Sequence, residues 1–263
     1  MMLQNKVAVI YGAGGSIGGA VARAFAREGA RLFLTGRLRA PVEAVAQDIV
    51  SAGGAGQAAE VDALDEQAVD EHLQFVLDKA GRVDISFNAV GIPQAKLLGV
   101  PLVELDVEQF SLPIAAYTRS FFLTARLAAR RMIANKAGVI MTVTALPART
   151  GNPLLGGYVP AQGAKEALIR SLSTELAPHG VRVVGLRAQG MPETRTLKEA
   201  FEFRAKLAGM TWEQFQEVLA SRTHPRRLMT LAEMANVAAF MASDQASGMT
   251  GTSVNLSMGT VDD

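Results

Sequence analysis

The sequence of 263 residues contains no cysteine. This absence excludes disulfides, thiolate metal sites and thiol nucleophiles. Charged residues account for only 19% of the chain, and 26 Lys and Arg against 25 Asp and Glu leave a net charge of +1. Because neither sign is in excess, no long-range field favours nucleic acid or an anionic membrane as a partner.

Long apolar runs are also missing. No stretch reaches the roughly 18 consecutive apolar residues that indicate a membrane-spanning helix, and the apolar start of the chain is too short for a signal peptide. We therefore expect a soluble, cytoplasmic protein without a membrane partner. The apolar share of 49% is large enough to build a substantial core.

Apolar, β-branched runs alternate with amphipathic stretches, which predicts βαβ units and a parallel sheet with helices on both faces. Because the expected strands are apolar throughout, we expect them to be buried on both faces. The expected strands cover residues 6–11, 31–35, 57–61, 83–87, 139–144, 181–186 and 253–256. The expected helices cover residues 17–28, 41–52, 66–80, 106–134 and 158–177.

No linker, repeat or low-complexity segment interrupts this pattern. We therefore expect one domain over residues 1–263, with a charged helical insertion at about 192–224 that forms a lid. We expect the aromatic residues of this insertion to pack the lid. Lone histidines at positions 72, 179 and 224 are far apart in the sequence, so we expect them on the surface and no metal site.

A glycine cluster, YGAGGSIGG at residues 11–19, lies between the first expected strand and the first expected helix. Glycine lets the chain reverse sharply and lets the backbone approach a diphosphate, and the helix N-terminus behind it offers free N–H groups. The cluster therefore predicts a dinucleotide phosphate site, with a plain strand-to-helix turn as the alternative.

At this point the chain resembles the short-chain dehydrogenase/reductase family, in particular its 3-oxoacyl-acyl-carrier-protein reductase-like members. The family's Thr-Gly-x-x-x-Gly-x-Gly cradle corresponds to Tyr11, Gly12, Ser16 and Gly18, and its Asn-Asn-Ala-Gly stretch corresponds to residues 88–91. The resemblance covers essentially the whole chain. It implies an α/β fold, a Rossmann-type doubly wound parallel sheet of about seven strands with helices on both faces.

The resemblance also implies how the chain binds its partners. Asp62 corresponds to an acid that holds the adenine, and Met191 lies in a stretch that helps to hold the nicotinamide. The full expected cofactor-binding set is Gly12, Ser16, Ile17, Gly18, Arg37, Asp62, Asn88, Gly91 and Met191. The expected partners are a small-molecule or acyl substrate and further copies of the chain, in a homodimer or homotetramer formed through helices near 120–133 and from 158 onward.

The end of the second expected strand distinguishes NADP(H) from NAD(H). Family members that bind NAD place an acid there, whereas this sequence has Gly36 followed by Arg37. A guanidinium suits a 2′-phosphate, and the missing carboxylate removes repulsion. We therefore predict NADP(H) in preference to NAD(H), with a solvated Arg37 as the alternative.

The catalytic positions of the family are only partly retained. Tyr158 stands where the proton-donating tyrosine is expected, but the lysine expected four residues later is Gln162. Lys165 follows Tyr158 by seven residues, which returns to nearly the same helix face. The enoyl-acyl-carrier-protein reductases of this family use that spacing and also tend to carry Ser-Ile in the cradle, as residues 16–17 do here. Lys165 is thus a candidate catalytic cation, and a surface lysine is the alternative.

Two further positions differ. Ala145 replaces the expected serine, and Ile114 replaces the expected asparagine. Thr144 supplies a candidate hydroxyl if the strand end is shifted by one residue, since neighbouring strand residues face opposite sides. Three of the four reactive positions have therefore changed.

These residues favour an NADP(H)-dependent oxidoreductase that reduces a carbonyl or enoyl group, with Tyr158 as proton donor. The alternative is a catalytically weak or inactive dinucleotide-binding homologue that acts as a sensor or a partner subunit. Turnover of NADPH that is lost in Tyr158→Phe would indicate the enzyme, and NADPH binding without turnover would indicate the alternative.

Overall fold

The fold is built on one parallel sheet. A computed structural model describes residues 1–93 and 98–262, and across these residues seven strands pair in the order β3-β2-β1-β4-β5-β6-β7. Their bounds are β1 Val7–Tyr11, β2 Arg31–Gly36, β3 Ala55–Glu60, β4 Ile85–Asn88, β5 Gly138–Ala145, β6 Val181–Ala188 and β7 Thr252–Leu256. The strand order reverses between β1 and β4, which confirms the predicted doubly wound, Rossmann-type sheet.

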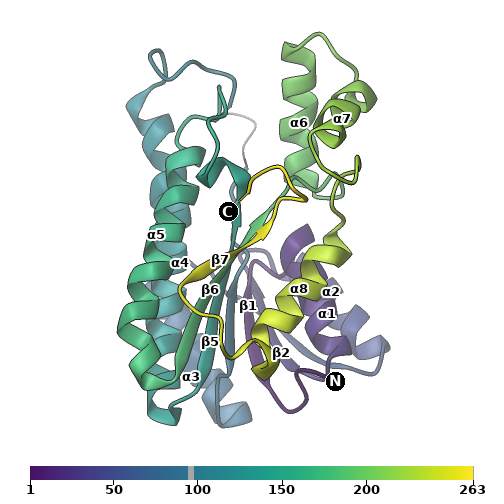
Figure 1. Ribbon diagram of the computed structural model, residues 1–263. Coiled ribbons are helices and arrows are strands. Elements are labelled where there is room, and N and C mark those ends of the chain that lie inside the picture. The colour runs from purple at the N-terminus through teal and green to yellow at the C-terminus, as the bar shows by residue number, and fades with distance from the viewer. Residues whose placement is uncertain (94–97, 263) are drawn as a thin grey trace.

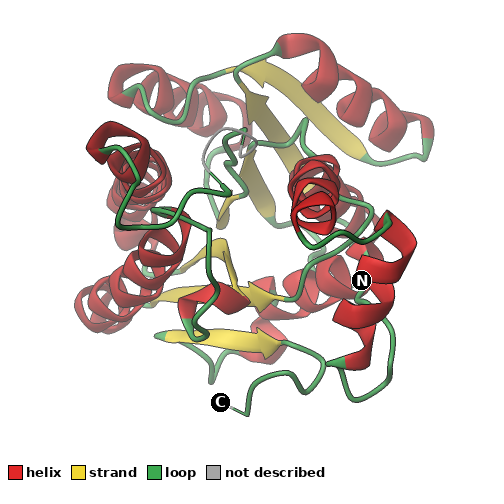
Figure 2. Cartoon of the chain, turned by 90° about the horizontal axis from the view of Figure 1, so that it is seen from above, coloured by secondary structure: helices red, strands yellow, loops and turns green. Residues whose placement is uncertain are grey.

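Helices cover both faces of the sheet (Figures 1 and 2). One layer contains α1 (Ser16–Arg27), α2 (Arg39–Ser51) and α8 (Leu231–Ala242), and the other contains α3 (Glu66–Ala80), α4 (Val107–Asn135) and α5 (Tyr158–Leu176). Two further helices, α6 (Arg195–Leu207) and α7 (Trp212–Ser221), lie together beyond the carboxyl ends of the strands (Figure 1). Of the helices in the described ranges, none combines the length and the apolarity needed to cross a bilayer.

The two helix layers bury a separate apolar cluster on each face of the sheet. Ile10 and Leu34 point toward the α1 side, whereas Val9 and Phe33 point toward the α3 side, because successive strand residues face opposite sides. All five residues of β1 are buried, as expected for a central parallel strand.

The expectation that every strand is fully buried is wrong for the two edge strands, β3 and β7, and most clearly for β3. Residues 55–60 alternate between exposed and half-buried positions. β3 is an edge strand that pairs only with β2, so it lacks a neighbour on its outer side. Small apolar residues such as Ala58 and Ala59 give this segment the sequence pattern of a core strand, although β3 lies at the edge of the sheet.

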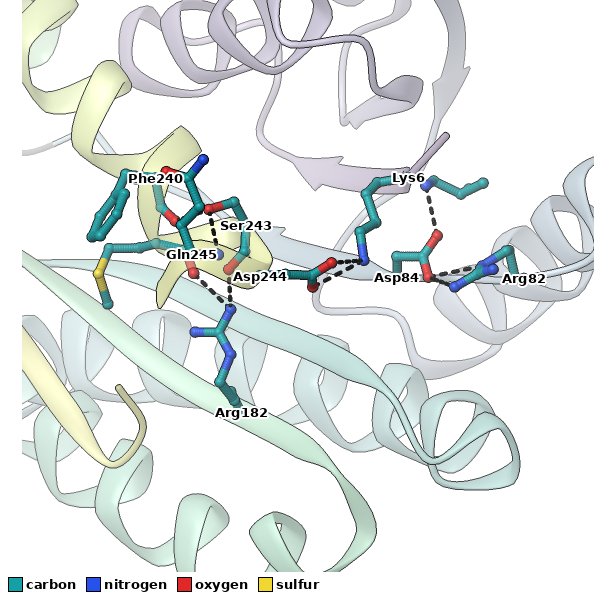
Figure 3. Close-up of polar contacts among 10 residues, drawn as sticks. Lys6, Arg82, Asp84, Arg182, Phe240, Ser243, Asp244 and Gln245 are labelled. Atoms are coloured by element: carbon teal, nitrogen blue, oxygen red, sulfur yellow. Dashed lines mark hydrogen bonds and ion pairs between the residues drawn. The ribbon is translucent and has the colours of Figure 1, made fainter. Parts of the chain in front are cut away.

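Polar contacts hold the amino ends of the strands, the edge opposite α6 and α7 (Figure 3). The Arg182 guanidinium of β6 donates to the backbone oxygen of Ser243 at 2.9 Å, and the Lys6 Nζ pairs with the Asp244 carboxylate at 3.0 Å. The Asp84 carboxylate accepts from the first amide of β1 at 2.8 Å. These bonds fix strand ends without occupying the carboxyl edge of the sheet.

His72 on α3 corrects the expectation that all three histidines lie on the surface. Its side chain is buried, and its ring packs near the rings of Phe33 and Phe75 at centroid distances of 6.5 and 6.3 Å. The Nδ1 atom has no hydrogen-bond partner among the described residues. Burial lowers the pKa of His72 from 6.5 to about 4, because the apolar surroundings disfavour the imidazolium. His179 and His224 are exposed, as predicted.

This burial predicts a stability that depends on pH. Between pH 6.5 and 4 the unfolded chain protonates His72 and the folded chain does not, so stability is lost as the pH falls through that window. We expect this one group to account for up to about 3 kcal/mol of the loss. Urea unfolding from pH 7 to pH 4 measures it, and His72→Leu should weaken the pH dependence while the exposed His179→Gln should not. Equal pH dependence in the wild type and His72→Leu would contradict this account.

Candidate functional site

The backbone of the turn after β1 lies in close contact with the loop after β4 and with the first turns of α1. Gly12 has φ +75°, and a Cβ there would lie 2.7 Å from the Ala89 oxygen. A Cβ on Gly18, in the first turns of α1, would lie 2.3 Å from the Gly12 oxygen. Side chains at these two positions would push α1 and the loop after β4 away from the turn. The glycine pattern therefore permits a close approach of backbone segments.

A cleft of about 330 Å³ opens along this turn, and we call it the glycine cleft. Its walls are the turn at residues 12–17, the segment 36–42 after β2, the loop 88–93 after β4, and one face of α5. Its cationic side chains are Arg37, Lys165 and Arg195, and no Asp or Glu is present among the described residues that line it. The cleft is therefore electropositive, which favours an anionic ligand.

The sequence-predicted cofactor residues divide between this cleft and other places. Gly12, Ser16, Ile17, Arg37, Asn88 and Gly91 line it. Gly18 acts behind it through the close packing just described. Asp62 does not line it, and its Oδ1 instead accepts from the Leu64 amide at 3.0 Å. Met191 is buried in the wall of a second cavity described below.

Asn88 fixes the loop that follows β4. The Asn88 Nδ2 donates to the Thr124 Oγ1 of α4 at 3.1 Å, and its Oδ1 accepts from the Val90 amide at 3.2 Å. The Thr142 hydroxyl of β5 donates to the Asn88 backbone oxygen at 3.0 Å. Since its amide group is engaged on both sides, Asn88 holds the wall of the cleft in place.

Ser16, at the start of α1, links the turn to the helices beyond the sheet. The Ser16 Oγ accepts from the Arg195 amide at 3.3 Å. Arg195 is the first residue of α6, so this bond places the start of α6 over the glycine turn.

A second cavity of about 330 Å³ lies between the end of β5, the stretch after β6, and helices α6 and α7, and we call it the lid cavity. Four residues line both the glycine cleft and the lid cavity, namely Ile17, Val143, Thr144 and Tyr158. Tyr158 is the first residue of α5. Because it lines both spaces, it lies where they meet.

Lys165 faces the same site. Its side chain is only 2% exposed, so the interpretation as a surface lysine is wrong. The Lys165 Nζ donates to the Val143 backbone oxygen at 2.5 Å and lies 5.6 Å from the centre of the Tyr117 ring. Burial lowers the pKa of Lys165 from 10.5 to about 7, because desolvation disfavours the ammonium.

Gln162 and Thr144 lie where the sequence predicts a departure from the family pattern. Gln162 is buried in the wall of the glycine cleft, and Ala145 lines the lid cavity without a polar group. The Thr144 hydroxyl donates to the Glu166 carboxylate at 3.0 Å. The same carboxylate pairs with the buried Arg187 guanidinium at 2.7 Å.

Sequence reasoning missed Tyr117, Glu166 and Arg187. Tyr117 lies on α4, and its ring meets the Tyr158 ring edge-on at a centroid distance of 5.7 Å. The only signal for it was a polar aromatic residue one helical turn after Ile114. Glu166 and Arg187 are 21 positions apart in the sequence, so no local pattern announces their pairing. In the described ranges, no group of three or more His, Asp or Glu side chains is placed to hold a metal ion.

Comparisons with known proteins agree with this architecture. A short-chain dehydrogenase family model, described as enoyl-(acyl carrier protein) reductase, matches residues 12–260. The uncharacterized oxidoreductase YxbG of Bacillus subtilis (strain 168) is 32% identical over 96% of this chain and 89% of its own length. The 3-oxoacyl-acyl-carrier-protein reductase of Escherichia coli (strain K12) is 27% identical over 98% of both chains.

A solved structure is also similar over most of its length. The complex of 7α-hydroxysteroid dehydrogenase with NADH and 7-oxo glycochenodeoxycholic acid superposes with a TM-score of 0.87 and 28% identity, covering 99% of this chain and 96% of the other. The sheet and helix layers of that enzyme therefore match those of this chain.

Proposed function

The chain belongs to the short-chain dehydrogenase/reductase family of oxidoreductases, and from that premise we propose that it is an NADP(H)-dependent reductase of a carbonyl or enoyl group in a small or acyl substrate, with Tyr158 as proton donor. The observation that carries the proposal is the position of Tyr158 at the junction of the glycine cleft and the lid cavity. A phenol there can reach a group bound in either space.

The glycine cleft fits a nicotinamide dinucleotide. Gly12 and Gly18 leave backbone where a side chain would close the turn, and the N-terminus of α1 offers free N–H groups to a diphosphate. Asn88 and the stretch around Met191 would hold the nicotinamide end. When bound, such a cofactor supplies the hydride. The relative solved with NADH supports this assignment.

NADP(H) is the proposed dinucleotide because of the charges at the end of β2. Gly36 and Arg37 line the cleft, and no carboxylate is present among its described residues. Arg37 is exposed and lies where a 2′-phosphate can meet it. A guanidinium binds phosphate through paired, charge-assisted hydrogen bonds.

This assignment predicts a cofactor preference that a single variant should reduce. We expect wild-type protein to bind NADPH more tightly than NADH. Arg37→Gln should weaken NADPH binding by about tenfold or more and leave NADH binding almost unchanged. Fluorescence titration of both cofactors measures it. Arg39→Gln is the matched control, because Arg39 is exposed, pairs with Glu43 at 3.1 Å and does not line the cleft. Tighter binding of NADH by the wild type would contradict the assignment.

Proton transfer is the task of the side chains on α5. The Tyr158 hydroxyl would give its proton to the substrate oxygen, and the Lys165 ammonium would stabilise the charge left on the phenolate. The Val143 oxygen holds that ammonium in the wall of the cleft. Lys165 thereby supplies the positive charge that Gln162, at the position of the family's lysine, lacks. The Thr144 hydroxyl donates to Glu166, so it is left as a hydrogen-bond acceptor. It would accept from the hydroxyl of the reduced product and would not donate to the carbonyl oxygen of the substrate.

Helices α6 and α7 complete the arrangement. We assign them to a lid at residues 192–224 of a single domain, since the lid cavity lies beneath them and Ser16 binds the first turn of α6. We also propose that the chain forms a homodimer or homotetramer through α4 and α5.

The proposal distinguishes the two phenols of the site. Tyr158→Phe should lower the rate of NADPH oxidation with a panel of ketone and acyl substrates by about 100-fold or more. Tyr117→Phe, which removes the neighbouring hydroxyl, should cost less than about tenfold. The opposite order would make Tyr117 the donor. Binding of NADPH without turnover of any substrate by the wild type would instead favour a non-catalytic dinucleotide-binding protein.

The buried lysine predicts a pH dependence. Because the pKa of Lys165 is about 7, the ammonium loses its proton above that pH and the phenol loses its cation. The rate should therefore fall as the pH rises through about 7 to 9. Lys165→Met should be slower at pH 6 and should lack this fall. A wild-type profile that is retained in Lys165→Met would place the ionisation elsewhere and return Lys165 to a structural role.

A further inference from the structure

The lid cavity is apolar near Tyr158 and cationic at the lid. Its walls include Leu146, Leu155 and Phe201, whereas its charged residues are Arg204 and Arg222, both from the region of α6 and α7. No Asp or Glu occurs among the described residues that line it. Arg204 is half-buried and Arg222 is exposed. A half-buried guanidinium without a paired acid is stabilised when a ligand brings the opposite charge.

Arg204 has no carboxylate partner among the described residues. It is half-buried on α6, and its guanidinium carbon lies 5.6 Å from the centre of the Phe215 ring on α7. Within residues 1–93 and 98–262, no carboxylate lies within 4 Å of the Arg204 or Arg222 guanidinium. Burial and the nearby charge of Arg222 lower the pKa of Arg204, so the two guanidinium groups are close enough to repel each other.

Other arginines of the chain behave differently. Arg131, Arg187 and Arg227 each pair with a carboxylate at 2.7, 2.7 and 2.6 Å. The two arginines of the lid cavity differ from these three, because neither pairs with a carboxylate in the described part of the chain. Their side chains meet in one cavity, and that cavity also reaches Tyr158.

We infer that the lid cavity binds substrates that carry an anionic group, a carboxylate or a comparable acid, at the end remote from the reacting carbon. The anion lies between Arg204 and Arg222, the apolar body lies against Leu155 and Phe201, and the reacting group lies at Tyr158. The inference rests on the proposed function for the reacting end. The anion site itself depends only on the two arginines and the cavity, so binding tests it without turnover.

Trp212 provides the readout. It is the only tryptophan of the chain, and its ring stacks with that of Phe201 at a centroid distance of 6.3 Å. Since Phe201 lines the lid cavity, a bound ligand should change the Trp212 emission. The probes are hexanoate, octanoate and decanoate, each compared with the neutral alcohol of equal chain length. Each titration is run without cofactor and with saturating NADP⁺.

We expect at least one carboxylate to bind more tightly than its alcohol in the wild type. Arg204→Gln and Arg222→Gln should weaken carboxylate binding by about 10- to 100-fold and leave alcohol binding nearly unchanged. Lys206→Gln, which removes an exposed charge from the same helix outside the cavity, should have no effect. Arg204→Lys keeps the charge and should bind the carboxylate far better than Arg204→Gln, even if the packing on Phe215 is disturbed.

Three results would overturn the inference. The first is that every alcohol of the series binds the wild type as tightly as its carboxylate. The second is carboxylate binding that is unaltered in both glutamine variants, and the third is no change in Trp212 emission with any of the carboxylates. A failure of NADPH turnover would leave these titrations readable, so it bears on the proposed function alone. Conversely, turnover of keto acids with an unchanged KM in Arg204→Gln would retain the reductase and remove the anion site.

Discussion

The site depends on a backbone contact that only glycine permits. Gly12 lies against the Ala89 backbone, and Gly18 lies against Gly12, at distances where any Cβ would collide. These contacts draw β1, α1 and the loop after β4 together at the point where the strand order reverses. The glycine cleft forms along this junction, and its position brings the N-terminus of α1 and the wall fixed by Asn88 to the same space. Without that close approach the side chains of α5 would have no cleft to face.

The second feature of the site is a group of buried charges on α5 and β6. Lys165 and Glu166 are adjacent on α5, and both are almost fully buried. The lysine donates to the Val143 oxygen, and the glutamate binds Thr144 and Arg187. Burying an unpaired charge is expensive, so each of these groups needs its partner in place. These polar contacts lie beside Tyr158, close to the predicted departures from the family pattern at Ala145 and Gln162. This supports a retained but rearranged reaction centre over a site that has merely decayed.

Much of the fold could be predicted from the sequence, and less of the site. Hydrophobic periodicity located the central strands and α3, whose bounds of 66–80 match the prediction, because local pattern and burial agree there. The pattern failed at β3, since small residues on an edge strand resemble a core strand. It also failed at His72, which tertiary packing places between aromatic rings. The approach of Tyr117 to Tyr158 and of Glu166 to Arg187 joins elements distant in sequence. Only the folded chain shows that Lys165 is buried, because helix periodicity predicts the face on which a residue lies and not whether that face is covered.

We propose that Tyr158 and Lys165 form one reaction centre with a bound dinucleotide. A crystal structure of the complex with NADP⁺ tests it most directly, through the separation between the Lys165 Nζ and the nicotinamide ribose hydroxyls. The account predicts hydrogen-bond distance, about 3 Å, with the Tyr158 hydroxyl facing the nicotinamide ring. A lysine that stays on the Val143 oxygen beyond about 6 Å from the ribose, too far even for weak hydrogen bonding, would contradict it, as would a nicotinamide ring turned away from Tyr158.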